Sequence, residues 1–220
     1  MKASQHPEAA FLATMTASAT HEVRNVLAII KESAGLIEDM IHVFAKKGTL
    51  DNEKVYRAVD RIDTQVKRGA DLLTNLNRLS HTLDSDLATV ELNTEVQQVA
   101  FLSQRFARKR GHRIVANCTE ATANTLVHPL HLQMALFAAM ECCMEELPDG
   151  AAITLSVAVR EGSPVLEIRG DSEDGATVPG PSDGEGWAGI RKWTESLGVT
   201  LERSQTGFGI RMLFPPATGG

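Results

Sequence analysis

The 220 residues, 43% hydrophobic and 23% charged, have the composition of an ordinary globular protein and suffice for one large domain or two small ones. The net charge of −6 argues against a general surface for nucleic acid or anionic membranes. Three cysteines without disulfide or metal-site spacing, and no apolar run approaching the ~20 residues of a membrane span, lead us to expect a cytoplasmic protein with buried thiols.

Two long helices are expected first. Their apolar residues recur at alternating steps of three and four, which is a heptad seam that packs against partner helices at a shallow angle. Gly48 ends the first helix and Asp51 or Asn52 caps the second, so the two form an antiparallel hairpin. The seam residues are Val23, Val26, Ile30, Ser33, Ile37, Met40 and Phe44 in the first helix, and Val55, Val59, Ile62, Val66, Leu73, Leu76 and Leu83 in the second.

A two-helix hairpin cannot cover such a seam alone. Two copies are therefore expected to close a four-helix bundle in a homodimer. The alternative is that the seam packs against the rest of the same chain.

The pattern changes after residue 86. A helix capped by Asn93 or Thr94 is expected to end near Gly111, and a second helix to run from Pro129 to about Leu147. Further elements are a strand over 112–118, a hairpin over 152–159 and 165–169, a helix over 187–197, and strands near 199–203 and 208–214. The predicted fold class is α+β, with a helical hairpin over 1–86 that forms a dimeric four-helix bundle and a two-layer α/β sandwich over 87–220.

One histidine stands in a context that suits phosphoryl transfer. His21 lies two residues before Val23, hence on the outward face, and Asn25 shares that face about 6 Å away. Imidazole is a competent nucleophile near neutral pH, and its phosphoryl adduct is labile enough to be passed on. Glu22 can accept the imidazole proton or fix the tautomer, and the amide of Asn25 can position water or the phosphoryl group. Arg24 completes the candidate site.

The simpler interpretation of any histidine on a helix is a solvated or locally hydrogen-bonded side chain. We apply it to the other six, which are His6, His42, His81, His112, His128 and His131.

The context of His21 favours a phosphoacceptor role, because the run His-Glu-x-Arg-Asn-x-Leu from His21 to Leu27 resembles the H-box of histidine kinases of the HisKA type. The hairpin is similar to the dimerisation and histidine-phosphotransfer domain of that family. Residues from about Leu92 to Pro215 resemble its ATP-binding domain, the GHKL or Bergerat fold, in the order of their elements. The resemblance covers nearly the whole chain and is most specific at the H-box.

The second domain departs from the family where nucleotide should bind. The two N-box asparagines that would hold Mg²⁺ and phosphates align with Ala138, which offers no ligand, and Cys142, whose thiol is a poor ligand for a hard cation. The aspartate of the next box, which would bind adenine, aligns either with Gly170 or, after a shift of one, with Asp171, which then places Glu173 on a glycine position.

The expected lid over the triphosphate is acidic. Gly184 and Gly186 align with the second glycine box, but the segment 171–188 carries five carboxylates and neither Lys nor Arg, so it would repel a triphosphate. The resemblance therefore implies vestigial nucleotide positions at Ala138, Cys142, Asp171, Gly184 and Gly186. We expect neither ATP binding nor a metal held by this chain.

A kinase-like dimer that keeps the histidine and loses nucleotide chemistry resembles the histidine phosphotransferases of multistep phosphorelays, of the ChpT and Spo0B type. The resemblance implies response-regulator receiver domains as partners, an upstream hybrid histidine kinase, Mg²⁺ supplied by the receiver, and docking on the second domain and its acidic loop. The alternatives are a soluble divergent kinase that phosphorylates itself on His21, a response-regulator phosphatase using Asn25, and a pure interaction module.

Overall fold

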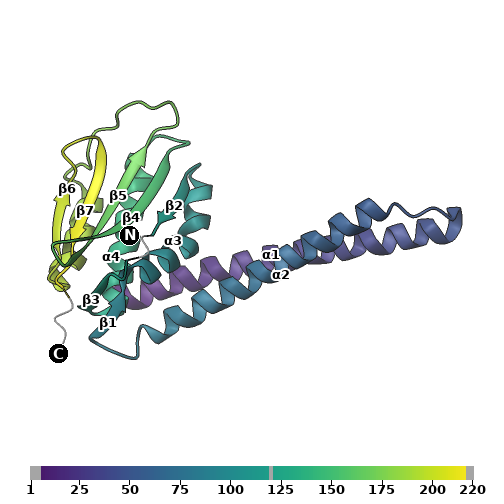
Figure 1. The fold of residues 1–220 in the computed structure, drawn as a ribbon, viewed down its shortest axis with the longest axis horizontal. Coiled ribbons are helices and arrows are strands. Elements are labelled where there is room, and N and C mark those ends of the chain that lie inside the picture. The colour runs from purple at the N-terminus through teal and green to yellow at the C-terminus, as the bar shows by residue number, and fades with distance from the viewer. Residues whose placement is uncertain (1–5, 119–120, 217–220) are drawn as a thin grey trace. The chain divides into compact units, whose positions relative to one another are not determined.

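The computed structural model describes residues 6–118 and 121–216, and Figure 1 shows their helices and strands. By internal contacts, residues 13–78 form one compact unit, and the residues on either side of this range form a second. We call them the hairpin unit and the sheet unit. The hairpin helices thus contribute their terminal residues to the sheet unit.

The hairpin consists of α1 (Pro7–Lys47) and α2 (Asn52–His81). Gly48 ends α1 in the left-handed conformation, with φ of +69°, which glycine adopts without steric cost. The Asp51 carboxylate accepts a hydrogen bond from the Lys54 backbone N–H at 3.1 Å and so caps α2. Both ends agree with the prediction.

The facing sides of the two helices carry small and polar residues as well as apolar ones. Val26 and Ser33 of α1 and Ala58 and Leu72 of α2 are buried. A Cβ atom on Gly69 would lie 3.3 Å from the Cγ1 atom of Val26, so this glycine lets the helices approach closely. The predicted seam of α2 is not buried as a whole within the hairpin. Its members Val59, Val66 and Leu73 are 50%, 54% and 58% exposed.

The sheet unit is a five-stranded sheet in the order β2–β4–β5–β7–β6, with α3 and α4 on one face (Figure 1) and α5 packed against α4 and β6. β2 and β4 are parallel and the other neighbours antiparallel. A separate antiparallel pair joins β1 and β3. The helices are α3 (Leu92–Lys109), α4 (Pro129–Glu146) and α5 (Glu185–Ser196); the strands are β1 (Ala88–Glu91), β2 (Arg113–Asn117), β3 (Asn124–Val127), β4 (Ala152–Arg160), β5 (Ser163–Asp171), β6 (Thr200–Arg203) and β7 (Phe208–Leu213).

The fold class is confirmed as α+β, with a long helical hairpin and a layered sheet-and-helix domain. Besides the partly exposed seam and Leu83, which lies beyond the end of α2 at His81, two details differ from the prediction. The pair β1 and β3 was not expected, and α3 is capped by Glu91, whose carboxylate accepts the Thr94 backbone N–H at 2.8 Å and the Asn93 side-chain N–H at 2.7 Å. Among the described helices, none combines the length and apolar character that crossing a bilayer requires.

Candidate functional site

His21 is exposed on α1, and Asn25 lies one turn further along the same face. The Nδ2 atom of Asn25 is 3.3 Å from the Nδ1 atom of His21. Arg24 is also exposed and points about 60° further around the helix than His21. The structure thus brings His21 and Asn25 together, as their spacing predicts.

The amide of Asn25 can serve either tautomer of the imidazole. With Nδ2 toward the ring, its N–H donates to an unprotonated Nδ1; with the amide rotated, the oxygen accepts from a protonated Nδ1. The second arrangement leaves the lone pair of Nε2 available for attack on phosphorus. Among the described residues, Nε2 of His21 has no hydrogen-bond partner.

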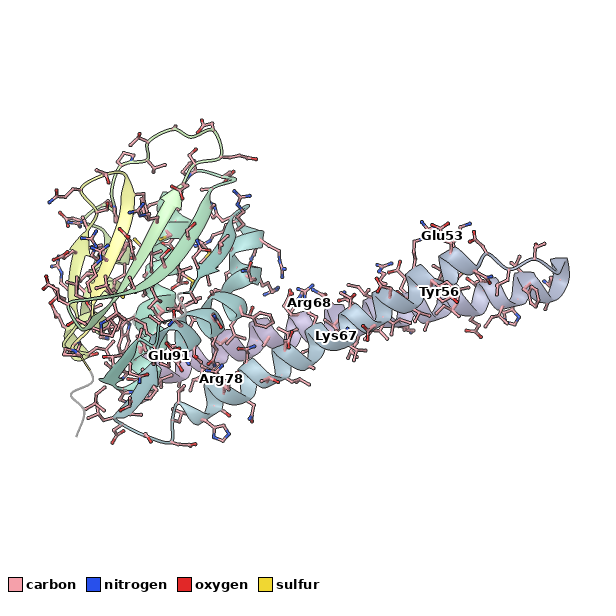
Figure 2. All side chains as sticks on the ribbon, in the orientation of Figure 1. Glu53, Tyr56, Lys67, Arg68, Arg78 and Glu91 are labelled. Carbon is pink, nitrogen blue, oxygen red and sulfur yellow. The ribbon has the colours of Figure 1, made fainter. Side chains whose placement is uncertain are left out.

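Glu22 takes a position that the motif alone did not reveal. Its side chain is 10% exposed and forms an ion pair with Arg68 of α2, which Figure 2 labels. A second cross-helix pair, Glu32 with Arg61 at 3.2 Å, lies further along the same hairpin. The acid–base role predicted for Glu22 stays a prediction. Arg68 was not identified from the sequence, because finding it requires the register between the two helices.

His21 lies away from the apolar surface of the hairpin. Val23, Leu27, Ile30, Ala34, Ile37, Ile41 and Phe44 follow one face of α1 at alternating steps of four and three, and each is half-buried or exposed. We call these residues, with Val59, Val66 and Leu73 of α2, the apolar stripe. At 100° per residue, His21 points roughly 160° away from the α1 part of the stripe.

In the sheet unit, the last two residues of β5 face opposite ways: Gly170 lies on the side of the helices and Asp171 on the other side. Ile168 and Gly170 are buried, whereas Arg169 and Asp171 are exposed, as strand alternation requires. A Cβ atom on Gly170 would lie 2.4 Å from Cδ2 of Leu147, so the buried Leu147 side chain fills the space beside this strand end. The residue that faces α4 here is therefore glycine, which carries no carboxylate for an adenine amino group.

The two N-box positions also lack ligands for Mg²⁺. Ala138 is half-buried, and Cys142 is 1% exposed. Burial, together with the nearby Glu146 carboxylate that accepts the thiol hydrogen bond, raises the pKa of Cys142 to about 12. The group therefore stays a neutral thiol. A Cβ atom on Gly186 would lie 3.2 Å from the Sγ atom of Cys142, so the start of α5 packs directly against α4.

The loop that would form the lid is fastened to the unit by side chains. Glu146 accepts the backbone N–H of Ser182 at 2.8 Å, and Asp183 pairs with Arg203 of β6. The guanidinium of Arg203 lies 4.0 Å above the ring of the buried Trp187. Gly184 is the N-cap of α5, without a side-chain cap. Arg203, like Arg68, comes from a distant part of the sequence and was not predicted.

These residues do not fit a magnesium nucleotide. The carboxylate of Glu146 adds a negative charge beside Ser182, in the loop before α5, the thiol of Cys142 is neutral, and Asp171 is exposed on the side away from the helices. Within the described ranges, no three His, Cys, Asp or Glu side chains are grouped to hold a metal ion.

Comparisons with known proteins find similarity to solved structures of histidine kinases. Neither a protein-family profile nor a curated protein matches the sequence. The match to the catalytic domain of histidine kinase ThkA covers 60% of this chain and 97% of the ThkA chain, at 13% identity and a TM-score of 0.49. The match to histidine kinase AdeS of Acinetobacter baumannii covers 90% of this chain and 98% of the AdeS chain, at 14% identity and a TM-score of 0.48. The match to the blue-light activated histidine kinase EL346 of Erythrobacter litoralis covers 93% of this chain and 63% of the EL346 chain, at 15% identity and a TM-score of 0.47. At such identities, the functional argument is carried by the residues of the site.

Proposed function

We propose that this protein is a histidine phosphotransfer protein, which moves a phosphoryl group between receiver-domain aspartates through His21, with little or no ATP binding. The observation that carries the proposal is the contrast between the two units. His21 is exposed with Asn25 on its Nδ1 side. At the candidate nucleotide positions, Leu147 lies against Gly170, Cys142 against Gly186, and Glu146 accepts the Ser182 N–H.

The transfer needs only the imidazole and the incoming phosphoryl group. The lone pair of Nε2 attacks phosphorus, the bond from phosphorus to the receiver's carboxylate oxygen breaks, and the electron pair leaves with that carboxylate. The Nδ1 proton is held by the Asn25 oxygen or released to water as the adduct forms. Attack by a second receiver's aspartate reverses these steps. Mg²⁺ would come with the receiver.

We propose a homodimer as the working form. The apolar stripe follows heptad spacing on both helices, and Leu27, Val66 and Leu73 in it are 54% to 58% exposed. A second copy of the same hairpin supplies a surface with the same spacing, which is the arrangement of a four-helix bundle. His21, on the opposite side of α1, would stay accessible to a receiver.

The contact between Asn25 and His21 favours one second activity. An amide one turn from the histidine could orient water against an aspartyl phosphate docked there, which is phosphatase chemistry. Its signature would be faster loss of phosphate from a receiver, without a stable phosphohistidine, abolished by Asn25→Ala.

The test uses the full chain and a receiver domain phosphorylated on aspartate, in buffer with Mg²⁺ and without ATP. We expect label to appear on the protein and His21→Ala to abolish it. The matched control is His42→Ala, an exposed histidine of the same helix, which should leave labelling unchanged. Label that persists in His21→Ala would remove His21 from the reaction.

The kinase alternative is tested separately. A divergent kinase would bind ATP saturably and label itself from radioactive ATP. We expect no heat in a calorimetric titration with ATP and Mg²⁺, and self-labelling abolished by His21→Ala would replace phosphotransfer with autophosphorylation as the function.

A further inference from the structure

The charge of the sheet unit is distributed unevenly. Residues 96–118 contain five Lys or Arg and neither Asp nor Glu, in a chain whose net charge is −6. The five are Arg105, Arg108, Lys109, Arg110 and Arg113, and all but the half-buried Arg105 are exposed. We call them the basic patch. They lie at the end of α3 and the beginning of β2.

The backbone under the patch is fixed from two sides. At the end of α3, the N–H of His112 donates to the carbonyl of Ala107 at 2.9 Å, and Gly111 has a φ of +73°. The His112 ring is 4% exposed, with its Nε2 atom 3.3 Å from the carbonyl oxygen of Met144 in α4. The Gly111 carbonyl accepts the Gly150 N–H at 3.2 Å. A buried histidine between Arg110 and Arg113 thus anchors the turn while its neighbours face solvent.

Helix capping accounts for only part of this charge. Cations in the last turn of a helix stabilise its C-terminus, which explains Arg108 and Lys109. Arg113 lies on β2, beyond the helix, and β2 is an edge strand of the sheet, with Val115 40% exposed. An exposed edge strand beside fixed cations is a surface suited to a partner.

The surroundings of the patch favour an acidic protein over nucleic acid. Glu145 lies 3.5 Å from Arg110. Asp149 precedes Gly150, whose backbone N–H donates to the carbonyl of Gly111. These carboxylates bound the patch and would repel a long polyanion, whereas a compact acidic surface can avoid them.

We propose that the basic patch is a docking surface for an acidic face of the receiver domain that exchanges phosphoryl groups with His21. This inference rests on the proposed function and names a surface for its partner. Rim charges of this kind act mainly on encounter and affinity, so they should not alter the chemical step at His21.

The test compares two doubly substituted proteins that lose the same charge. Lys109→Gln with Arg113→Gln removes two cations from the patch. Arg160→Gln with Arg191→Gln removes two exposed cations elsewhere in the same unit. Purified receiver domains of the same organism are screened for transfer to wild-type protein, and those that transfer are titrated against all three proteins at low and high salt. Binding of the same receivers and of duplex DNA is measured in parallel.

We expect the patch variant to need about five times more receiver for half-maximal rate at low salt, with an unchanged maximal rate and less salt dependence. The control variant should stay within about twofold of wild type. Equal behaviour of the two variants, a lower maximal rate alone, or a loss confined to DNA binding would overturn the patch and leave phosphotransfer standing. If no receiver transfers to or binds the wild-type protein, both the proposed function and this docking surface fail.

Discussion

A stacked histidine pair makes stability depend on pH at a single residue. His131 lies with its ring centroid 4.0 Å from that of His128, its Nε2 atom 3.5 Å from a carboxylate oxygen of Glu8, and the ring of Trp193 on α5 at 5.1 Å. Burial lowers the pKa of His131, as do the neighbouring His128 and, more weakly, Lys192. Glu8 opposes this effect, and Asp86 stands 4.0 Å from His128.

Because the native pKa of His131 lies below its unfolded value of about 6.5, protonation favours the unfolded chain. The contribution of His131 to stability is complete above that value and is lost as pH falls below it. We therefore expect the free energy of unfolding in urea to fall between about pH 7.5 and pH 5, and His131→Gln to reduce that fall. His42→Gln, at an exposed site, is the control. An identical pH dependence in wild type and His131→Gln would contradict this account.

Sequence reasoning reached the parts of the candidate site that depend on local spacing. His21 and Asn25 are four residues apart in one helix, so periodicity alone places them together. Arg68 and Arg203 were not found, because their partners Glu22 and Asp183 are reached only through the tertiary fold. The filling of the space beside Gly170 by Leu147 is equally non-local.

At the scale of elements, strong local signals explain which boundaries could be predicted. Gly48, Gly111 and Pro129 each fix a helix end through backbone geometry, and the structure has helix ends beside all three. β1 and β3 are four residues each and pair only with one another, so they have too few apolar positions for a period to be read. Glu91 is not among the usual N-cap residues, which explains the displaced start of α3.

Two glycines inside the hairpin helices should respond differently to the same change. A Cβ atom on Gly35 meets nothing within 4 Å, whereas one on Gly69 meets the stiff, buried Val26 side chain at 3.3 Å. Gly35→Ala should therefore raise the free energy of unfolding by about 0.5–1 kcal/mol. Gly69→Ala should be less stable than Gly35→Ala by roughly 1 kcal/mol, because the side chain of Val26 must move. Urea denaturation of the two variants measures the difference, and equal stabilisation would show that α1 and α2 do not approach closely at Gly69.

At the scale of the whole molecule, the proposed function requires that one surface of the hairpin be covered while His21 remains accessible. The helical positions meet this requirement, since the apolar stripe and His21 lie on opposite sides of α1. The hairpin unit has no third helix to cover the stripe, and an apolar row of this length is costly to leave in water. In the proposed homodimer, a second copy would cover the stripe and leave His21 accessible through one symmetric contact.

The dimer is tested by placing one charge in the stripe and the same charge outside it. Val66, in the stripe, and Val43, which points to the His21 side of α1, are 54% and 47% exposed. Val66→Glu should yield a monomer by light scattering after gel filtration, because burying paired carboxylates at a two-fold interface costs several kcal/mol. Val43→Glu should remain dimeric. A dimeric Val66→Glu, or a wild-type protein that is monomeric at micromolar concentration, would show that the stripe is not the contact between copies. The stripe would then be an exposed apolar surface for a different partner.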